Sequence, residues 1–388
     1  MGSWPPPAAA SQPDWPPGVH AALRFDAFMD SALYHPTHGF YSGGRGGPGR
    51  RGDFLTSVEV GPLFGAVTAR YLDHVWDELG RPHPFRVADV GAGPGTWART
   101  IKAARPRCQT ALALTLVERS AQARASHPTE VAGTVGGLAE LGCCHVILAN
   151  ELLDNLAVRI CQHDAGRWQE LWVGPQGEEL RPLADRADLA DGAGMADHAG
   201  LADHAGLADG ARIPLAEQAF AWVTQARKLL EPGGRLLVFD YGATTAELAQ
   251  RPDAGWLRTY RDHQQGRAAW QDPGTQDITC EVAFDQLPEA NERISQSSWL
   301  QRWGLAELVE EGRAHWKARA AVADLAAWAA RSRLREAEAL ADPAGLGGFW
   351  VAQWNPFEPM GADGRAAPTA PAAPGVAAAR SAPDHENT

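Results

Sequence analysis

Mostly apolar runs alternate with helical patterns along the middle of this chain. The apolar runs of strand length are residues 85–90, 112–117, 145–149 and 235–240. Continuous runs of this kind are typical of parallel strands that are covered on both faces, because neither face then meets water. Apolar residues with a helical period occupy residues 25–33, 63–79 and 216–230. The pattern predicts an α/β fold with a doubly wound parallel sheet.

The same pattern divides the chain into segments. Proline dominates the first segment and alanine, proline and glycine the last, and both compositions predict disorder because they offer little to bury. The segments are residues 1–19 (disordered), 20–84 (N-terminal helices and lid), 85–245 (sheet core), 246–345 (mostly helical substrate-side extension), 346–357 (final edge strand) and 358–388 (disordered tail).

One internal repeat interrupts the core. Near-copies of L-A-D-H-A-G recur every six residues between residues 189 and 210. Four copies rich in alanine, glycine and aspartate bury too little to form a solenoid. We therefore predict a low-complexity insertion at residues 183–212. His198 and His204 are six positions apart and do not share a helical face, so no metal site is predicted.

Composition excludes several classes of function. The 388 residues include 35 basic and 47 acidic ones, for a net charge of −12. With no compensating basic cluster, we expect no nucleic-acid partner, and a cationic or neutral substrate is easier to bind. The odd number of cysteines and the absence of C-x-x-C favour a reducing compartment. No signal-peptide pattern and no 18-residue apolar stretch occur, so we expect a cytoplasmic protein with no membrane partner.

A glycine-rich turn follows the first apolar run. Gly91, Gly93 and Gly95 form G-x-G-x-G, a spacing that lets the backbone turn sharply and approach a ligand. The dinucleotide fingerprint places a third small residue one position later, where this chain has Thr96. The turn therefore favours S-adenosyl-L-methionine, which has no pyrophosphate, over NAD.

Two acidic residues support this choice of cofactor. Glu118 ends the second apolar run, where its carboxylate can accept hydrogen bonds from both ribose hydroxyls. Asp89 precedes the first glycine by two positions and adds an anion that would repel phosphates but attract an ammonium or a sulfonium. The alternative is that both carboxylates are merely solvated at strand ends.

The third apolar run ends on candidate catalytic residues. Asn150, Glu151 and Asp154 follow it, and the two acids would share one face if a helical turn begins here. Two carboxylates beside a sulfonium can hold a cationic nucleophile in line with the methyl group and accept its proton. An arginine guanidinium is well suited, because it is planar and binds carboxylates in a forked geometry. The alternative is an N-cap by Asn150 or Asp154, with Glu151 exposed.

Several further segments of the chain carry a resemblance to a known family. They are Tyr34-His35-Pro36, Gly39-Phe40-Tyr41, residues 52–65, the glycine turn, Asn150-Glu151 with Asp154, residues 238–242 and residues 272–279. Over about residues 25–355 the chain resembles the MidA-like methyltransferases, which include a mitochondrial complex I assembly factor that methylates a protein arginine. The resemblance implies a Rossmann-like class I S-adenosyl-L-methionine-dependent methyltransferase fold. It also assigns Gly91, Gly93, Gly95 and Glu118 to the cofactor, and Asn150, Glu151 and Asp154 to the reaction centre.

The comparison with the family also concerns an N-terminal loop and one motif in which this chain differs from the family. Asp53 and Thr56 lie in the N-terminal loop of the resemblance, which would either close over the cofactor as a lid or merely cap the sheet. The family motif continues as D-A-L-P, whereas here Asp154 is followed by Asn155-Leu156-Ala157.

Together these features predict a methyltransferase that acts on an arginine-bearing protein. Two alternatives remain: methylation of a small molecule such as a natural-product hydroxyl, and a non-catalytic assembly factor that retains the fold. The oligomeric state, including a homodimer, stays open.

Overall fold

The computed structural model describes residues 21–43, 56–183, 207–261, 264–319 and 325–357. Residues up to Pro356 form one unit, and Phe357–Thr388 form a second. The predicted disorder at residues 1–19 and 358–388, most of the repeat and Asp53 lie outside the described residues. Among the described residues, no helix is both long enough and apolar enough to cross a membrane.

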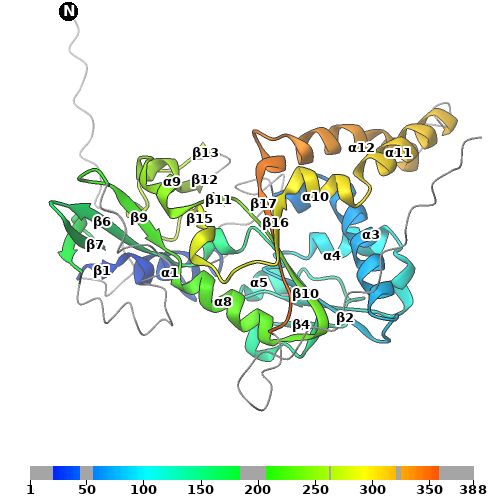
Figure 1. Ribbon diagram of the computed structural model, residues 1–388, viewed down its shortest axis with the longest axis horizontal. Coiled ribbons are helices and arrows are strands. Elements are labelled where there is room, and N and C mark those ends of the chain that lie inside the picture. The colour runs from blue at the N-terminus through cyan, green and yellow to red at the C-terminus, as the bar shows by residue number, and fades with distance from the viewer. Residues whose placement is uncertain (1–20, 44–55, 184–206, 262–263, 320–324, 358–388) are drawn as a thin grey trace, which may run out of the picture. The chain divides into compact units, whose positions relative to one another are not determined.

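A seven-stranded sheet forms the centre of the first unit (Figure 1). Its strand order is β16 (Glu292–Ser295), β17 (Trp350–Trp354), β10 (Leu230–Asp240), β5 (Cys144–Asn150), β2 (Phe85–Val90), β3 (Leu112–Val117) and β4 (Gly133–Val135). The strands from β10 to β4 are parallel, as the four apolar runs predicted.

Successive residues of these strands enter two separate hydrophobic clusters. Val87, Leu148 and Leu237 belong to one cluster with residues of α3 (Pro62–Glu78), α4 (Thr96–Ala103) and α10 (Gln296–Arg302). Their chain neighbours Ala88 and Val238 belong to the other, with residues of α1 (Phe25–Tyr34) and α8 (Glu217–Lys228). Since side chains alternate across a strand, the sheet is covered on both faces, and the doubly wound prediction is confirmed.

The prediction of a final edge strand at residues 346–357 was wrong. β17 lies inside the sheet, antiparallel to both β10 and β16, and Val351 pairs with Phe239 on one side and Ile294 on the other. The alternating pattern suggested one exposed face. In fact Val351 packs in one hydrophobic cluster and Ala352 in the other, so both faces of the strand are buried.

A second, antiparallel sheet departs from the predicted core. Strands β6 (Arg159–Asp164), β7 (Arg167–Gly174), β8 (Gly177–Pro182) and β9 (Arg212–Leu215) are inserted between β5 and α8, and β1 (Leu23–Arg24) joins them from the N-terminal segment. The order is β1, β7, β6, β9, with β8 pairing β7. The predicted insertion at residues 183–212 connects β8 to β9, and residues 184–206 of it are not described.

The prediction of a mostly helical extension at residues 246–345 holds only for its second part. The first part contains most of α9 (Thr245–Ala249), β12 (Leu257–Arg261), β13 (Gln264–Gln265), β14 (Asp277–Cys280) and β15 (Val282–Ala283), which pairs with β11 (Gly242–Ala243) just before the extension. Thr259 pairs with Ile278 across β12 and β14, and such pairs of β-branched residues stabilise sheets. Helices α11 (Leu305–Arg319) and α12 (Leu325–Ala341) form the second part.

Candidate active site

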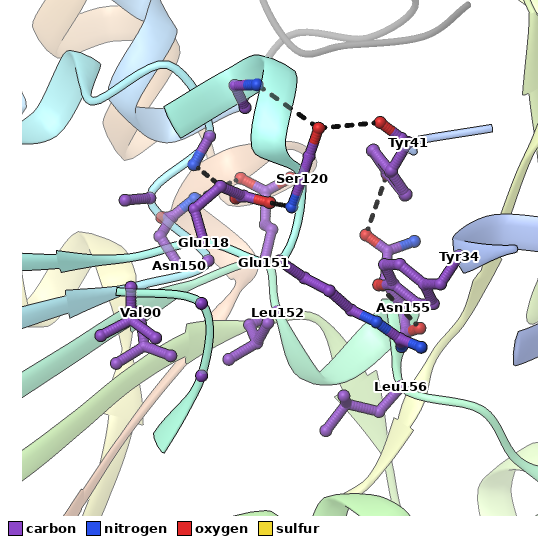
Figure 2. A pocket seen from close by; sticks show the side chains of 18 of the residues that line it. Tyr34, Tyr41, Val90, Glu118, Ser120, Asn150, Glu151, Leu152, Asn155 and Leu156 are labelled. Carbon is purple, nitrogen blue, oxygen red and sulfur yellow. Dashed lines mark hydrogen bonds between the residues drawn. The ribbon is translucent and has the colours of Figure 1, made fainter. Parts of the chain in front are cut away.

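A cavity of about 650 Å³ lies where β2, β3 and β5 end, at the carboxyl edge of the parallel strands. Its lining includes Gly91, Glu118 and Glu151, each of which directly follows one of these strands. Ligands of doubly wound sheets bind at this edge, and the volume is in the range of small-molecule sites. Figure 2 shows Glu118, Asn150 and Glu151 on one side of the view and Tyr34, Tyr41 and Asn155 on the other.

The glycine turn forms part of the cavity wall. Gly91 has a φ of 73°, and a Cβ there would lie 3.0 Å from Cδ1 of Leu152. Gly91 and Gly93 line the cavity, but Gly95 does not. Gly95 is instead the left-handed N-cap residue of α4. A Cβ there would lie 3.0 Å from Leu116 and from the ring of Pro128. Its role is to let the helix begin.

Glu118 lies beside this turn. Its Oε2 accepts a hydrogen bond from the Gly93 N–H at 2.9 Å, and its Oε1 accepts one from the Ser120 N–H at 2.6 Å. Burial raises the pKa of Glu118, although these backbone donors oppose the shift. Each carboxyl oxygen has a second lone pair, so the side chain can still accept hydrogen bonds from ribose hydroxyls.

Asp89 lies outside the cavity. Its side chain is buried and is not part of the lining, and no hydrogen bond to Oδ2 occurs within the described residues. Burial, with a smaller contribution from the nearby Glu118 carboxylate, raises the pKa of Asp89 to about 7. Asp89 therefore does not line the cavity, and its predicted attraction for a cationic part of the cofactor stays a prediction.

Glu151 reaches the cavity from an unusual backbone conformation. It follows β5 directly with a φ of 49°, in the left-handed region that non-glycine residues seldom adopt. Its Oε1 accepts hydrogen bonds from the Ser57 N–H at 3.1 Å and from Nδ2 of Asn150 at 3.0 Å. Burial, followed by repulsion from Asp154, raises the pKa of Glu151 to about 8. The cavity therefore contains a carboxyl group whose charge a bound cation would stabilise.

The sequence predicts that Asp154 and Glu151 share a helical face, but in the structure they do not. The chain enters a short 3₁₀ turn only at Leu153–Asn155, and its N-cap residue is Leu152, so neither Asn150 nor Asp154 is the N-cap of this turn. The Tyr241 hydroxyl donates to Oδ2 of Asp154 at 2.7 Å, and Asp154 does not line the cavity. Burial raises its pKa to about 6. Asp154 is thus absent from the cavity lining, and its predicted place at the reaction centre stays a prediction.

Asp240 is a third carboxyl group near Glu151 and Asp154. It ends β10 and is fully buried, and its Oδ2 accepts hydrogen bonds from the N–H groups of Leu153 and Asp154. Burial and the neighbouring carboxylates Asp154 and Glu151 raise its pKa well above the ordinary value. Asp240 therefore holds the turn after β5 in place.

Tyr34, Tyr41 and Asn155 are among the lining residues that were not predicted as site residues. The hydroxyl of Tyr41 donates to Oδ1 of Asn155 at 3.2 Å, and that of Tyr34 donates to its main-chain oxygen at 3.3 Å. The two rings stack with centroids 5.7 Å apart (Figure 2). The tyrosines belong to segments that carry the family resemblance, and Asn155 is the departure from D-A-L-P. In the sequence, only the family resemblance and this departure pointed to these three residues.

The described end of the N-terminal loop borders the same cavity. Thr56, Val58 and Glu59 line it, and Oγ1 of Thr56 is buried with no hydrogen-bond partner among the described residues. Asp53 lies outside the described residues, so its predicted role stays a prediction.

The residues present fit an adenosyl sulfonium. The cavity combines buried polar atoms without partners, Oγ1 of Thr56 and Oδ1 of Asn150, with apolar surface from Val90, Leu138 and Leu152. Among the described residues, the acidic lining residues are Asp30, Glu59, Glu118 and Glu151, and the basic one is Arg119. A diphosphate would be repelled here, whereas an ammonium or a sulfonium would be attracted.

Curated relatives share part of the chain. A mitochondrial protein arginine methyltransferase NDUFAF7 homolog of Drosophila melanogaster is 25% identical over 296 residues, which are 66% of this chain and 64% of that protein. The NDUFAF7 protein of Bos taurus is 32% identical over 69 residues, 18% of this chain and 15% of that one. The chain thus matches less than two thirds of the length of these relatives.

Solved structures match over more of the chain. A Burkholderia thailandensis protein, described as a "likely methyl transferase" and bound to S-adenosyl-homocysteine, has a TM-score of 0.68 at 25% identity, covering 86% of this chain and 87% of that one. A native structure from the same organism, with a TM-score of 0.67, 24% identity and the same coverage, shows the same fold.

A family model covers residues 67–301, more than half of the chain, and its description is "Putative S-adenosyl-L-methionine-dependent methyltransferase". This region contains the glycine turn, Glu118 and Glu151, so the family match includes part of the cavity lining, whereas Tyr34, Tyr41 and Thr56 lie before it. It also agrees with the resemblance to MidA-like methyltransferases and with the class I fold. The chain belongs to this family of S-adenosyl-L-methionine-dependent methyltransferases.

Proposed function

We propose that this protein transfers the methyl group of S-adenosyl-L-methionine to an arginine nitrogen of a protein substrate. The observation that carries the proposal is the place of Glu151, which lines the same cavity as the glycine turn and Glu118. In this proposal Gly91, Gly93 and Glu118 hold the adenosyl part, and Thr56 and Asn150 offer polar atoms to the rest. The cofactor would supply an electrophilic methyl group on a sulfonium.

Glu151 would bind the acceptor and take its proton. With a pKa of about 8, the carboxyl is partly protonated at neutral pH when no cation is present. A guanidinium beside it favours the ionised form, so the substrate itself would generate the carboxylate that binds it. The nitrogen–carbon bond would form as the carbon–sulfur bond of the sulfonium breaks and its electron pair returns to sulfur. The nitrogen must then lose one proton, and Glu151 can accept it. In this proposal the burial of Glu151 raises its affinity for a proton, and its negative charge binds the cationic substrate.

The choice of a protein arginine has separate support. The D. melanogaster relative is named as a protein arginine methyltransferase. The net charge of −12 also favours a cationic substrate over an anionic one.

A comparison of cells with and without this chain tests the proposal. Extracts from both are incubated with purified protein and isotopically labelled S-adenosyl-L-methionine, and tryptic peptides are searched for labelled methylarginine by mass spectrometry. We expect labelled peptides mainly in the extract that lacks the chain, because its sites are unoccupied. A parallel reaction with Glu118→Ala protein is the control.

Two results would contradict the proposal. Label in a small metabolite alone would favour the small-molecule alternative. Cofactor binding without any labelled product, in extracts and in a metabolite pool, would favour an assembly factor that retains the fold.

We further propose a reducing compartment, the cytoplasm, as the place of this reaction. The five cysteines are all free thiols, and Cys143 alone among them is exposed. Cell fractionation with an antibody against the chain tests this, and recovery in a secreted fraction would contradict it.

A further inference from the structure

Glu151 depends on its surroundings for its position. Its φ of 49° is unfavourable for a residue with a Cβ, so the conformation persists only because neighbouring contacts hold it. Its carboxyl group has two donors, Nδ2 of Asn150 and the backbone N–H of Ser57. Asn150 precedes it in the chain, whereas Ser57 comes from α2 (Ser57–Val60), 94 residues away in sequence.

Ser57 is itself held by a buried glutamine. Its hydroxyl donates to Oε1 of Gln296 at 3.0 Å, and both side chains are fully buried. The Gln296 amide in turn donates through Nε2 to the main-chain oxygen of Leu340 at 3.1 Å, and its backbone N–H donates to the oxygen of Phe349 at 2.7 Å. Every polar atom of the Gln296 side chain is thus used, as burial requires.

Helix α12 holds the same segment at a second point. Glu336, four residues before Leu340, accepts a hydrogen bond from the Leu63 N–H at 2.9 Å. Ser332 also donates to Glu336. The short stretch from Ser57 to Leu63 is therefore attached to α12 at both ends, directly through Glu336 and indirectly through Gln296.

We propose that Ser57 and Gln296 are positioning residues, which hold the Ser57 N–H against the Glu151 carboxyl and so set where the methyl acceptor binds and when its proton leaves. Gln296 does not line the cavity, so it acts through Ser57 and not on the ligand. The inference rests on the proposed function, since it gives Glu151 a task in the reaction.

The expected consequence is a change in ionisation. The Ser57 N–H stabilises the ionised form of Glu151 and opposes the rise in its pKa. Without Gln296, the Ser57 segment loses its anchor and this hydrogen bond weakens. Glu151 would then ionise only at a higher pH, and the acidic limb of the activity profile would move upward by about half to one pH unit.

Gln286 offers a matched control for Gln296. It is also fully buried, its Oε1 accepts from the Ala216 N–H at 2.8 Å, and its Nε2 donates to Pro214 O at 2.8 Å and to Thr245 Oγ1 at 2.9 Å. None of these partners lines the cavity. Gln296→Ala and Gln286→Ala should therefore lose similar stability but differ at the site.

The experiment compares the two variants in three measurements. These are the pH profile of kcat/KM, the Kd for S-adenosyl-L-methionine, and amide hydrogen exchange of residues 57–63 in the cofactor-free protein. For Gln296→Ala we expect the profile to shift, exchange at residues 57–60 to accelerate about tenfold or more, and the Kd to change less than about threefold. Gln286→Ala should leave all three near wild type. Equal shifts in both variants, or none in Gln296→Ala, would overturn the inference.

A second variant and a second readout keep the test independent of folding and of the substrate. If Gln296→Ala does not fold, Ser57→Ala removes the same hydrogen bond by deleting one oxygen, and a smaller shift in the same direction is expected. The Glu151 carboxyl can also be titrated by ¹³C NMR, with its signal assigned by its loss in Glu151→Gln. An unshifted titration in both variants refutes the positioning role even where methyl transfer is confirmed. A shifted titration supports it even if no methyl acceptor is found.

Discussion

The backbone N–H of Gly93 donates a hydrogen bond to Oε2 of Glu118 across 2.9 Å. This bond joins the glycine turn after β2 to the acid at the end of β3, so two segments 25 residues apart form one rigid wall of the cavity. Nε2 of His127 lies 2.8 Å from the carbonyl oxygen of Gly93, which belongs to the next peptide group, so both backbone polar groups of Gly93 have a partner. The turn is thereby ordered before any ligand binds, which lowers the entropy cost of binding.

Loss of Glu118 should weaken binding of S-adenosyl-L-methionine. Glu118→Ala removes a charged acceptor for the ribose hydroxyls and also leaves the Gly93 N–H without its partner. Hydrogen bonds to charged groups contribute about 1.5–3 kcal/mol, so we expect a Kd about 10- to 100-fold higher in calorimetry. Glu130→Ala, which alters an exposed acid near the turn, should bind like wild type. Unchanged affinity in Glu118→Ala would show that the ribose binds elsewhere.

Glu151→Gln should separate chemistry from cofactor binding. Because the wild-type carboxyl has a pKa of about 8, its ionised fraction grows as the pH rises toward 8, and so should kcat/KM. The amide cannot ionise, so the variant should lack this rise and lose about 100-fold in kcat, a usual effect of removing a general base. Kd for S-adenosyl-L-methionine should remain within a few-fold of wild type. A variant that retained the acidic limb would mean that another group titrates there.

Asp89→Asn should change how stability depends on pH. The pKa of Asp89 is about 7 in the folded protein and ordinary in the unfolded chain, so the folded state binds the proton more tightly. The wild type therefore loses stability as the pH rises from about 4 to about 7, while the variant lacks this loss. The free energy of unfolding is measured in urea for both proteins. Its value for the variant minus its value for the wild type should rise by about 1–3 kcal/mol from pH 5 to pH 8.

Asp77→Asn is the control with the opposite sign. Hydrogen bonds from Arg107 and Arg81 lower the pKa of Asp77, so the stability it contributes is lost only as the pH falls through that lowered pKa. Between pH 5 and pH 8, the difference in the free energy of unfolding between Asp77→Asn and the wild type should therefore be constant. A constant difference for Asp89→Asn as well would mean that Asp89 is already ionised within the fold.

Asn155→Ala should destabilise the wall opposite Glu118. The substitution leaves Tyr41 without its acceptor and removes the Nδ2 donor to Oδ1 of Asp277. Loss of partners for buried polar groups costs about 1–3 kcal/mol, measurable as a lower midpoint in urea. Asn291→Ala changes an exposed asparagine and should cost less than about 1 kcal/mol. Equal effects of the two substitutions would show that the Tyr41 hydroxyl finds water instead.

The amino-acid sequence by itself determined the parallel core and the cofactor edge. Continuous apolar runs can be buried on both faces only between helices, so β2, β3, β5 and β10 followed from local pattern. The same reasoning placed Gly91 and Glu118 at neighbouring strand ends. These features depend on residues close together in the chain, and periodicity reports such short-range constraints directly.

Only the tertiary structure decided which of the acids reach the cavity. Asp154 was predicted to share a helical face with Glu151, but the left-handed conformation of Glu151 and the hydrogen bond from Tyr241 turn it away. The interior position of β17 and the antiparallel sheet between β5 and α8 likewise depend on pairing between distant segments. Such pairing is set by which surfaces bury each other, and no window of the sequence contains both partners.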